Sequence, residues 1–317
     1  MENFINEQRK IIKERTGNSP VLLLISGGVD SAVVSALLLK ILKKDQLHLM
    51  YIDTGLMRKN ETEEVRANLE KLGAENIHIV MCEDDFLPAL RGVTDPEEKR
   101  RIIGDMFIKI QEREVLHTAL AVRIGLPQDY FIARGTIRAD DIESGQNESP
   151  LVFAKRAEGK IIEPLAGLYK HEVRGLGRFL GVDEAIVNRR HFPESGLAAR
   201  IPGEVTKEKC GILREADAVF IDELKKRRCA SSGKSLYDEI RQAFAVLLPI
   251  RSVGVAGDVR KYGYVLTLCA INSAGGTTAS VYPFETLDLL EISARITNSV
   301  KEIGRVTYDV TGCNYEA

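Results

Sequence analysis

A run of six residues near the amino end combines the groups that hold a phosphate: Ser26-Gly27-Gly28-Val29-Asp30-Ser31. Glycines allow a backbone with positive φ, so several N–H groups can point at one oxyanion. The hydroxyls of Ser26 and Ser31 add donors, and the Asp30 carboxylate suits a magnesium ion that bridges phosphate oxygens. The run matches neither a Walker loop, which needs a closing lysine, nor the dinucleotide fingerprint G-x-G-x-x-G. These residues predict a phosphate site; the alternative is a tight turn without a ligand.

Two flanking segments must position this run. Residues 21–25 are apolar and predict a buried strand, and residues 32–42 predict a helix. A strand, a glycine turn and a helix direct the positive end of the helix dipole toward a bound anion. A second strand is predicted over 47–52. Because ligands bind beyond the carboxyl ends of parallel strands, we expect Ile52 and Asp53 to meet the rest of the ligand.

Strand and helix patterns alternate along the first 200 residues. Helices are predicted over 1–16, 61–72 (capped by Asn60), 96–124 and 169–181, and further strands over 77–81, 130–133 and 161–165. This alternation predicts an α/β fold with a doubly wound parallel sheet. The segment 145–160 is rich in polar and small residues, which predicts a mobile lid or a surface loop.

A Pro- and Gly-rich connection at 192–203 marks a predicted boundary between domains of 1–200 and 201–317. The second domain is predicted to be α+β, with helices over 206–228 and 286–300 and strands over 250–255, 262–271 and 306–310. We expect it to dimerise the protein and to close one side of the substrate site.

Three other places carry side chains suited to nucleotide chemistry. The loop 91–101 holds four basic residues, which taken alone favour a solvated face over a clamp for a phosphorylated substrate. Gly135 follows a predicted strand and precedes three acidic residues. This pattern suits contact with a nucleotide and a metal ion, and the alternative is an ordinary polar loop. Lys170 lies in the first turn of a helix, where a lysine gains nothing from the dipole, so a phosphate ligand is favoured.

The composition limits the class of protein. With 317 residues, 44% of them hydrophobic and 28% charged, the chain is long enough for two globular domains. A net charge of −2 excludes a global basic field for nucleic acid. The amino terminus lacks the apolar core of a signal peptide, and no apolar run is long enough for a membrane helix. Five cysteines, odd in number and without a C-x-x-C pair, favour a reduced cytoplasm and no zinc site.

The motif S-G-G-V-D-S after a buried strand resembles the loop of the N-type ATP pyrophosphatases, and the likeness covers nearly the whole chain. It is similar to the ATP pyrophosphatase subunit of GMP synthetases. The shared motifs are SGGVDS (26–31), IDTGLMRKNE (52–61), FLPALRGVTDPEEKRRIIG (86–104), GTIRADDIES (135–144), EPLAGLYKHEVRGLGRFLG (163–181), GLAARIPGEVT (196–206), QAFAVLLPIRSVGVAGDVR (242–260) and RVTYDVTG (305–312).

The resemblance implies a ligase that consumes ATP with Mg²⁺. ATP would adenylate a carbonyl oxygen of xanthosine monophosphate, and ammonia would then displace AMP to give GMP. By position, residues 26–31 would bind ATP with Ile52 and Gly135, and Asp30 would hold the metal. Asp30, Lys170 and Arg100 would be catalytic. The residues implied in acceptor binding are Arg100, Asp258 and Cys313.

The resemblance also implies partners. No glutamine amidotransferase domain precedes residue 1, so we expect a separate glutaminase subunit to supply ammonia. We expect the chain to form a homodimer and to bind neither a membrane nor a nucleic acid.

The acceptor half departs from the family pattern. The family's Lys-Ser-His-His-Asn lid is replaced by 145–149, its glutamine before Gly-Thr by Arg134, and an acidic residue beside Lys170 by His171. At 192–197 the chain has Phe-Pro-Glu-Ser-Gly-Leu in place of the family's Phe-Pro-Gly-Pro-Gly-Leu. Cys313 stands where the family has an acceptor-binding lysine.

These departures leave three hypotheses open. The chain is a divergent GMP synthetase subunit, an enzyme that transfers sulfur to another purine nucleotide such as a guanine nucleotide, or a non-catalytic ATP-binding protein. Cys313 motivates sulfur transfer, and its alternative role is that of a small buried hydrophobe.

Overall fold

The computed structural model divides the chain into two compact units, neither of which is one continuous stretch. Unit 1 comprises Met1–Asp53, Asn60–Cys82 and Asp105–Arg189, and unit 2 comprises Thr54–Lys59, Glu83–Gly104 and Arg190–Ala317. The structure describes residues 1–116, 129–138, 149–190, 192–229, 231–256, 259–274 and 278–311. Two early segments thus join the carboxyl-terminal unit, which nothing in the sequence patterns indicated.

Unit 1 is built on a five-stranded sheet in which every strand is parallel to its neighbours. The strands are β1 (Val21–Ile25), β2 (Leu47–Asp53), β3 (Ile77–Met81), β4 (Phe131–Ala133) and β5 (Ile161–Ile162). Their order is β3-β2-β1-β4-β5, so the chain winds outward from β1 through β2 and β3 and then returns to the other side of β1. β1, β2 and β4 are almost entirely buried, as strands covered on both faces must be. The predicted doubly wound α/β fold is confirmed.

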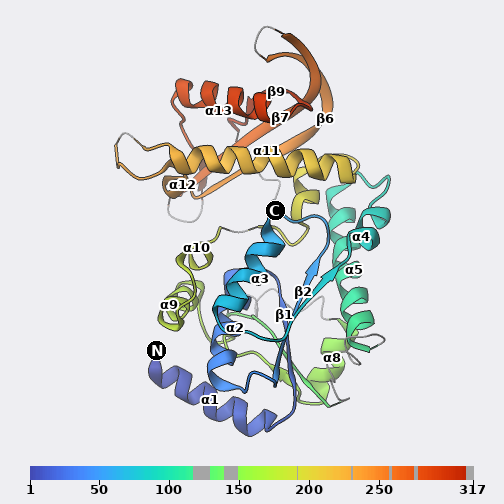
Figure 1. The fold of residues 1–317 in the computed structure, drawn as a ribbon, viewed down its shortest axis with the longest axis vertical. Helices are drawn as coiled ribbons and strands as arrows, with labels where there is room; N and C mark the ends of the chain where they lie inside the picture. Colours follow the sequence, from blue (N-terminus) through green and yellow to red (C-terminus); the bar gives the residue numbers. More distant parts are fainter. Residues whose placement is uncertain are drawn as a thin grey trace. The chain divides into compact units, whose positions relative to one another are not determined.

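Helices flank this sheet (Figure 1). Besides the later part of α5, which is given below, those described in unit 1 are α1 (Glu2–Thr16), α2 (Val29–Ile41), α3 (Glu61–Lys71), α8 (Pro150–Ala157), α9 (Lys170–Leu180) and α10 (Glu184–Val187). α1 confirms the predicted amino-terminal helix, in which Ile5 and Ile12 are buried and Ile11 is 40% exposed. None of the described helices combines the length and the apolar character that a membrane crossing requires.

α8 occupies part of the segment predicted to be a lid or a loop. Ser149 begins the helix by accepting a hydrogen bond from the backbone N–H of Val152 at 3.1 Å. Leu151 and Val152 are buried, so the prediction was wrong over 150–157. Residues 145–148 of the predicted lid lie outside the described part of the chain.

Two helices lead from β3 to the next part of the sheet. α5 (Pro96–Leu116) begins at its proline as predicted, and its predicted extension to residue 124 lies outside the described residues. α4 (Glu83–Ala89) was not predicted. Pro88 lies inside it and hides the helical pattern, and the fully buried side chain of Phe86 anchors it.

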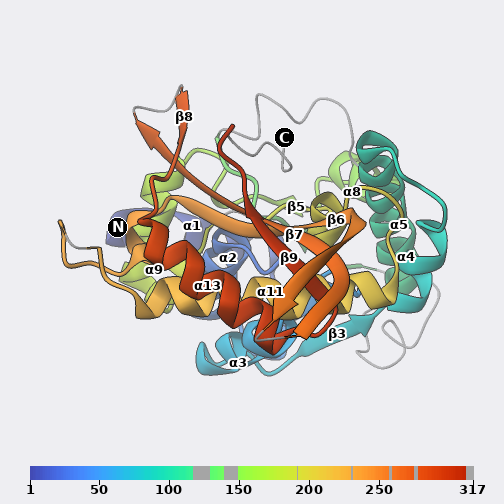
Figure 2. The same ribbon diagram turned by 90° about the horizontal axis from the view of Figure 1, so that it is seen from above.

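Unit 2 contains a second, mixed sheet (Figure 2). Its strands are β6 (Gln242–Ala256), β7 (Val259–Ala274), β8 (Thr278–Val281) and β9 (Ile303–Tyr308). β7 pairs antiparallel with β6 along one edge, and along the other with β8 (antiparallel) and β9 (parallel). β6 begins eight residues before the predicted strand. Pro249 and the shift in register between Leu247 and Arg251 interrupt the strand pattern, so only the part after the interruption was predicted. β8 was not predicted.

The helical elements of unit 2 cover its sheet. Apart from α4 and the start of α5, the described ones are the 3₁₀ helix η1 (Gly196–Arg200) and the α-helices α11 (Lys207–Lys226), α12 (Leu236–Glu239) and α13 (Thr286–Ser299). α11 and α13 confirm the two predicted helices. They contact each other, α11 contacts β6, and α13 contacts β9.

A buried ion pair joins three of these elements. Arg200 on η1 is only 3% exposed, lies 3.7 Å from Asp217 on α11, and places its guanidinium 4.5 Å from the ring centre of Phe244 on β6. Asp217 also accepts a hydrogen bond from the N–H of Ala245 at 2.8 Å. Because removing either charge would leave the other buried, the pair fixes η1 against α11 and β6.

Candidate functional site

The loop 26–31 lies at the point where the strand order reverses. β1 pairs with β2 on one side and with β4 on the other, with Leu23 opposite Ala133. The segments that follow β1 and β4 are therefore neighbours. A Cβ built on Gly135 would lie 3.2 Å from the backbone nitrogen of Ser31 and 3.3 Å from Cβ of Asp30. A crevice at such a switch point is where open α/β sheets bind ligands.

The loop has the conformation that its glycines allow. Gly27 has φ of 78°, and Gly28 is the N-cap of α2, which begins at Val29. The Ser31 hydroxyl donates to the carbonyl oxygen of Gly28 at 3.1 Å. The Ser26 hydroxyl lies 3.3 Å from that of Ser31 and accepts from the N–H of Gly28 at 3.3 Å. Two hydroxyls and the first turn of a 13-residue helix thus converge at this loop.

Lys170 reaches this loop, as its predicted role requires. Its ammonium nitrogen lies 2.5 Å from Oδ2 of Asp30, in the first turn of α2. The contact depends on close packing between α9 and α2, because a Cβ on Gly177 would lie 2.9 Å from Cγ2 of Val33. The Lys170 side chain is 46% exposed and that of Asp30 is 24% exposed, so the pair is open to a ligand.

The carboxyl end of β2 is already engaged by α3. Ile52 is buried, with 5% exposure, so only its backbone can border a nucleotide. Oδ2 of Asp53 accepts from the hydroxyl of Thr62 at 2.5 Å. Asp53 therefore anchors the first turn of α3 beside the loop.

An arginine that the sequence patterns missed contacts the loop from behind. Arg189 donates to the carbonyl oxygen of Gly27 at 2.7 Å and to Oε1 of Glu61 at 2.7 Å. Glu61, the first residue of α3, is 3% exposed. Arg189 lies 162 residues from Gly27 and belongs to no motif, so no local signal indicates it.

A second ionic cluster fixes the segment around Gly135. The carboxylate of Glu163 accepts from Arg156 at 2.9 and 3.0 Å and from the Thr136 hydroxyl at 2.9 Å. Burial opposes the ionisation of Glu163, but these hydrogen bonds hold its pKa below the usual value. The cluster connects the ends of β4 and β5.

One of the three predicted acceptor residues lies in the described part of the chain. Arg100 belongs to unit 2, where its guanidinium lies 3.2 Å from Glu97, and its side chain is 50% exposed. Asp258 and Cys313 lie outside the described residues.

The charged loop 91–101 is solvated in part. Arg91, Arg100 and Arg101 are exposed, in line with the expected solvated face. Lys99 differs, because it is 3% exposed and donates to the carbonyl oxygen of Ile201 at 2.6 Å. Burial lowers the pKa of Lys99 to about 8.

The free cysteines that the structure describes are Cys82, Cys210 and Cys229. Burial raises the pKa of the Cys210 thiol to about 11, which makes it a poor nucleophile. Cys229 differs, since hydrogen bonds from Ser231 and its neighbours lower its pKa to about 7. Cys269 is fully buried on β7.

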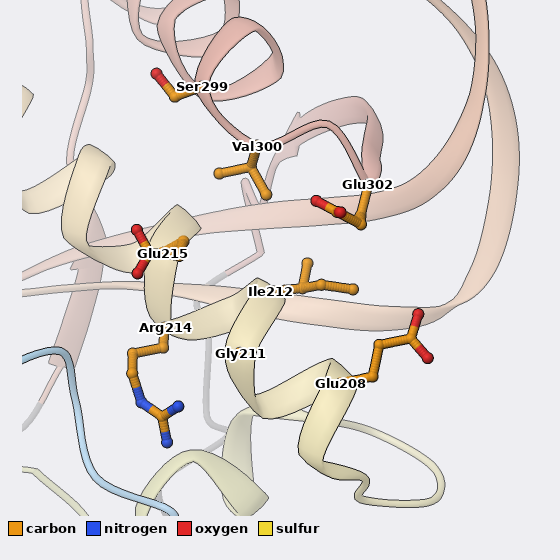
Figure 3. A pocket seen from close by; sticks show the side chains of 8 residues that line it. All are labelled: Glu208, Gly211, Ile212, Arg214, Glu215, Ser299, Val300 and Glu302. Carbon is orange, nitrogen blue, oxygen red and sulfur yellow. The ribbon is translucent and has the colours of Figure 1, made fainter.

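Unit 2 contains a pocket of about 400 Å³ whose lining includes none of the predicted site residues (Figure 3). It opens between α11 and the turn that joins α13 to β9, and its charged lining includes Glu208, Glu215 and Glu302. The Arg214 side chain points away from it and donates to the carbonyl oxygens of Met57 and Gly55 at 2.8 and 2.7 Å.

Comparison with known proteins gives two family models and several close relatives. The model described as GMP synthase C terminal domain matches residues 230–314, and that described as Asparagine synthase matches residues 9–107. Glutamine-hydrolyzing GMP synthases of Thermotoga petrophila, Zymomonas mobilis and Candida albicans are 43%, 45% and 44% identical to the chain over 98% of its length. The chain spans 60%, 58% and 59% of the lengths of those proteins. The resemblance to the GMP synthases expected from the motifs is confirmed.

Proposed function

We propose that this chain, a relative of the GMP synthases over 98% of its length, is an AMP-forming ligase that converts xanthosine monophosphate to GMP. ATP binds at residues 26–31 and adenylates the 2-carbonyl oxygen of the acceptor. Ammonia then displaces AMP. Adenylation is needed because an amide-like carbonyl is a poor electrophile whose oxygen is a poor leaving group. The observation that carries the proposal is the meeting of this loop with Gly135 and Lys170 at the switch point.

The chain's own groups account for the departure of pyrophosphate. Backbone N–H groups at the start of α2 and the hydroxyls of Ser26 and Ser31 are donors for phosphate oxygens. Lys170 adds a cation beside them. Donors that are already oriented stabilise the charge that develops on the leaving group without reorganising during the reaction.

The residues fit a magnesium ion. Oδ1 of Asp30 is buried and has no hydrogen-bond partner among the residues that the structure describes, whereas Oδ2 is engaged by Lys170. Carboxylate oxygen is a preferred ligand of Mg²⁺, which binds through one or two carboxylates and the substrate phosphates. When bound, the ion supplies charge neutralisation on the phosphates.

The acceptor is assigned by resemblance, with Arg100 and Asp258 as its expected contacts and Cys313 at the position of the family's lysine. Residues 1–200 form the proposed ATP pyrophosphatase domain, and 201–317 the proposed dimerisation and acceptor-binding domain. The comparisons favour neither sulfur transfer nor a non-catalytic role.

Ammonia is the remaining reagent. The similar proteins are named as glutamine-hydrolyzing, so we propose that a glutaminase supplies it, with a separate amidotransferase subunit as the partner to seek. A homodimer in the cytoplasm remains the expected state. Light scattering of the purified chain tests the dimer.

One incubation tests the chemistry. The purified chain is supplied with ATP, Mg²⁺, xanthosine monophosphate and ammonium, and GMP, AMP and pyrophosphate are measured. We expect the three products in equal amounts. Inosine monophosphate, which lacks the 2-carbonyl, is the matched control and should release no pyrophosphate. Formation of ADP and orthophosphate, or ATP binding without turnover of any purine nucleotide, would overturn the proposal.

A further inference from the structure

We infer that Arg189 is a positioning residue for the proposed reaction, because it fixes the orientation of the peptide between Gly27 and Gly28. The inference rests on the proposed function, since it concerns how this loop receives the pyrophosphate of ATP. Arg189 is assigned no contact with the ligand itself.

Two short hydrogen bonds hold the guanidinium in place. Nη1 donates to the carbonyl oxygen of Gly27 and Nη2 to Oε1 of Glu61, each at 2.7 Å. The side chain of Glu61 is 3% exposed and that of Arg189 is 16% exposed. Buried hydrogen bonds between charged groups are short and strong, so Glu61 fixes the arginine and the arginine fixes the carbonyl.

The geometry of the peptide group turns this contact into a constraint on the opposite face. A trans peptide is planar, and its C=O and N–H point in opposite directions. Because Arg189 holds the Gly27 oxygen, the Gly28 N–H points away from the guanidinium. It donates to the Ser26 hydroxyl at 3.3 Å, a long hydrogen bond that a bound phosphate oxygen can replace. This N–H is one of the donors proposed for the phosphate.

Without the arginine, the long hydrogen bond from the Gly28 N–H to the Ser26 hydroxyl is the contact described above that still favours this orientation. Gly27 has φ of 78°, and glycine populates positive and negative φ about equally. A flipped peptide would present a carbonyl oxygen to the anion, which repels it. The glycine therefore permits the required conformation, and Arg189 selects it.

A small cavity of about 20 Å³ lies beside Arg189 and is also lined by the loop residues Gly27, Gly28 and Ser31. This space holds a single water and is too small for a pyrophosphate. The arginine is therefore proposed to act on binding through the loop.

Calorimetry with two probes separates this role from a general loss of structure. Inorganic pyrophosphate with Mg²⁺ reports on the loop, and AMP reports on the remainder of the nucleotide site. For Arg189→Ala we expect pyrophosphate affinity to fall roughly 10- to 100-fold, the range seen when groups that orient ligand-binding atoms are removed. AMP affinity should change less than about twofold. Added guanidinium ion should restore part of the pyrophosphate binding.

Further variants protect the test against misfolding. The double variant Glu61→Gln with Arg189→Met removes both members of the buried pair and should show the same selective loss. Arg178→Ala, an exposed arginine bonded to Glu184 and Asn188, is the matched control and should bind both probes normally.

Three outcomes overturn the inference. Normal pyrophosphate binding by Arg189→Ala or by the double variant removes the positioning role. Equal loss of both probes in both variants assigns the arginine to general stability. A wild-type chain that binds neither AMP nor pyrophosphate overturns the proposed function, and the inference with it.

Discussion

The ammonium nitrogen of Lys170 lies 2.5 Å from Oδ2 of Asp30, although 140 residues separate the two in the sequence. The pair brings the first turns of α9 and α2 together at the phosphate loop. Asp30 keeps its other oxygen without a hydrogen-bond partner among the described residues, so one carboxylate can orient the lysine and receive a cation at the same time. A single contact thus links the two charged groups that the proposed chemistry needs.

Replacing this lysine should separate activity from stability. For Lys170→Met we expect acceptor-dependent pyrophosphate release to fall by about 100-fold or more, because a donor to the leaving group is lost. The free energy of unfolding should change by less than about 1 kcal/mol, since the half-exposed ion pair is screened by solvent. Rate assays and urea denaturation measure the two effects. Lys40→Met, at the exposed far end of α2, is the control. Retention of full activity would contradict the assigned role.

A single added methyl group should disturb the loop from the side of β4. In Gly135→Ala the new Cβ would lie 3.2 Å from the Ser31 nitrogen, so the backbone of the loop must shift by a few tenths of an ångström. We expect ATP affinity to fall about tenfold, because small displacements of positioned donors are costly. Titration calorimetry measures this. Gly167→Ala, whose Cβ meets nothing within 4 Å, should bind ATP normally. Equal affinity in both variants would show that the loop tolerates the crowding.

Local patterns sufficed for the parts of the site that are local. The glycine run after an apolar strand, Gly135 after the next strand, and Lys170 at a helix start each follow from a few adjacent residues, and the structure brings all three together. The parallel sheet follows from the same alternation of strands and helices.

Contacts that form only in the folded chain were missed. Arg189 meets Gly27 from 162 residues away, and nothing in its neighbours marks it. Lys99 lies in a charge run whose pattern indicates solvent, yet its ammonium group is buried against the Ile201 carbonyl. Burial depends on which segments pack together, and a charge pattern does not contain that information. Proline disfavours helices and strands locally, so α4, which contains Pro88, and the part of β6 before Pro249 were not predicted. Both elements form because packing in the folded chain overrides this local preference.

The stability of the chain should decrease in mild acid because of His48. Its side chain is 5% exposed on β2 and its ring is stacked at 5.8 Å on that of His78. Burial lowers the pKa of His48 to about 4. The charge of His78 contributes less in the same direction, and that of Asp45 opposes the shift. Burial also lowers the pKa of His78.

The unfolded chain, whose histidine pKa is about 6.5, therefore binds more protons than the folded chain between pH 6.5 and 4. His48 stabilises the fold fully above that window, and the contribution is lost as the pH falls through it. We expect a loss of roughly 2 kcal/mol from this group between pH 7 and pH 5. Urea denaturation at the two pH values, compared between wild type and His48→Gln, measures it. An identical pH dependence in both proteins would exclude His48 as the cause.

The crossing of three strands in unit 2 should not tolerate a side chain. A Cβ on Gly254 of β6 would lie 1.5 Å from the carbonyl oxygen of Gly304 on β9, so Gly254→Ala must move the backbone. We expect a loss of at least about 2 kcal/mol in the free energy of unfolding.

Gly211→Ala is the matched control for this substitution. Gly211 lies inside α11, and its Cβ would meet nothing within 4 Å. Alanine should therefore stabilise the chain by about 0.5–1 kcal/mol. Denaturant midpoints measure both variants. If Gly254→Ala were as stable as wild type, the close approach of the β6 and β9 backbones at Gly254 and Gly304 would be contradicted.

The interleaving of the two units along the chain has a consequence for synthesis. Arg214 binds the carbonyls of Gly55 and Met57, and Leu197 donates to the carbonyl of Leu56, whose side chain is 1% exposed. A nascent chain must therefore keep residues 54–59 unsatisfied until more than a hundred later residues have left the ribosome. Such long-range closure slows folding and exposes apolar surface meanwhile. Truncated chains that end before Leu197 and Arg214 cannot form these contacts. They should therefore require chaperones for solubility more than the full-length protein does.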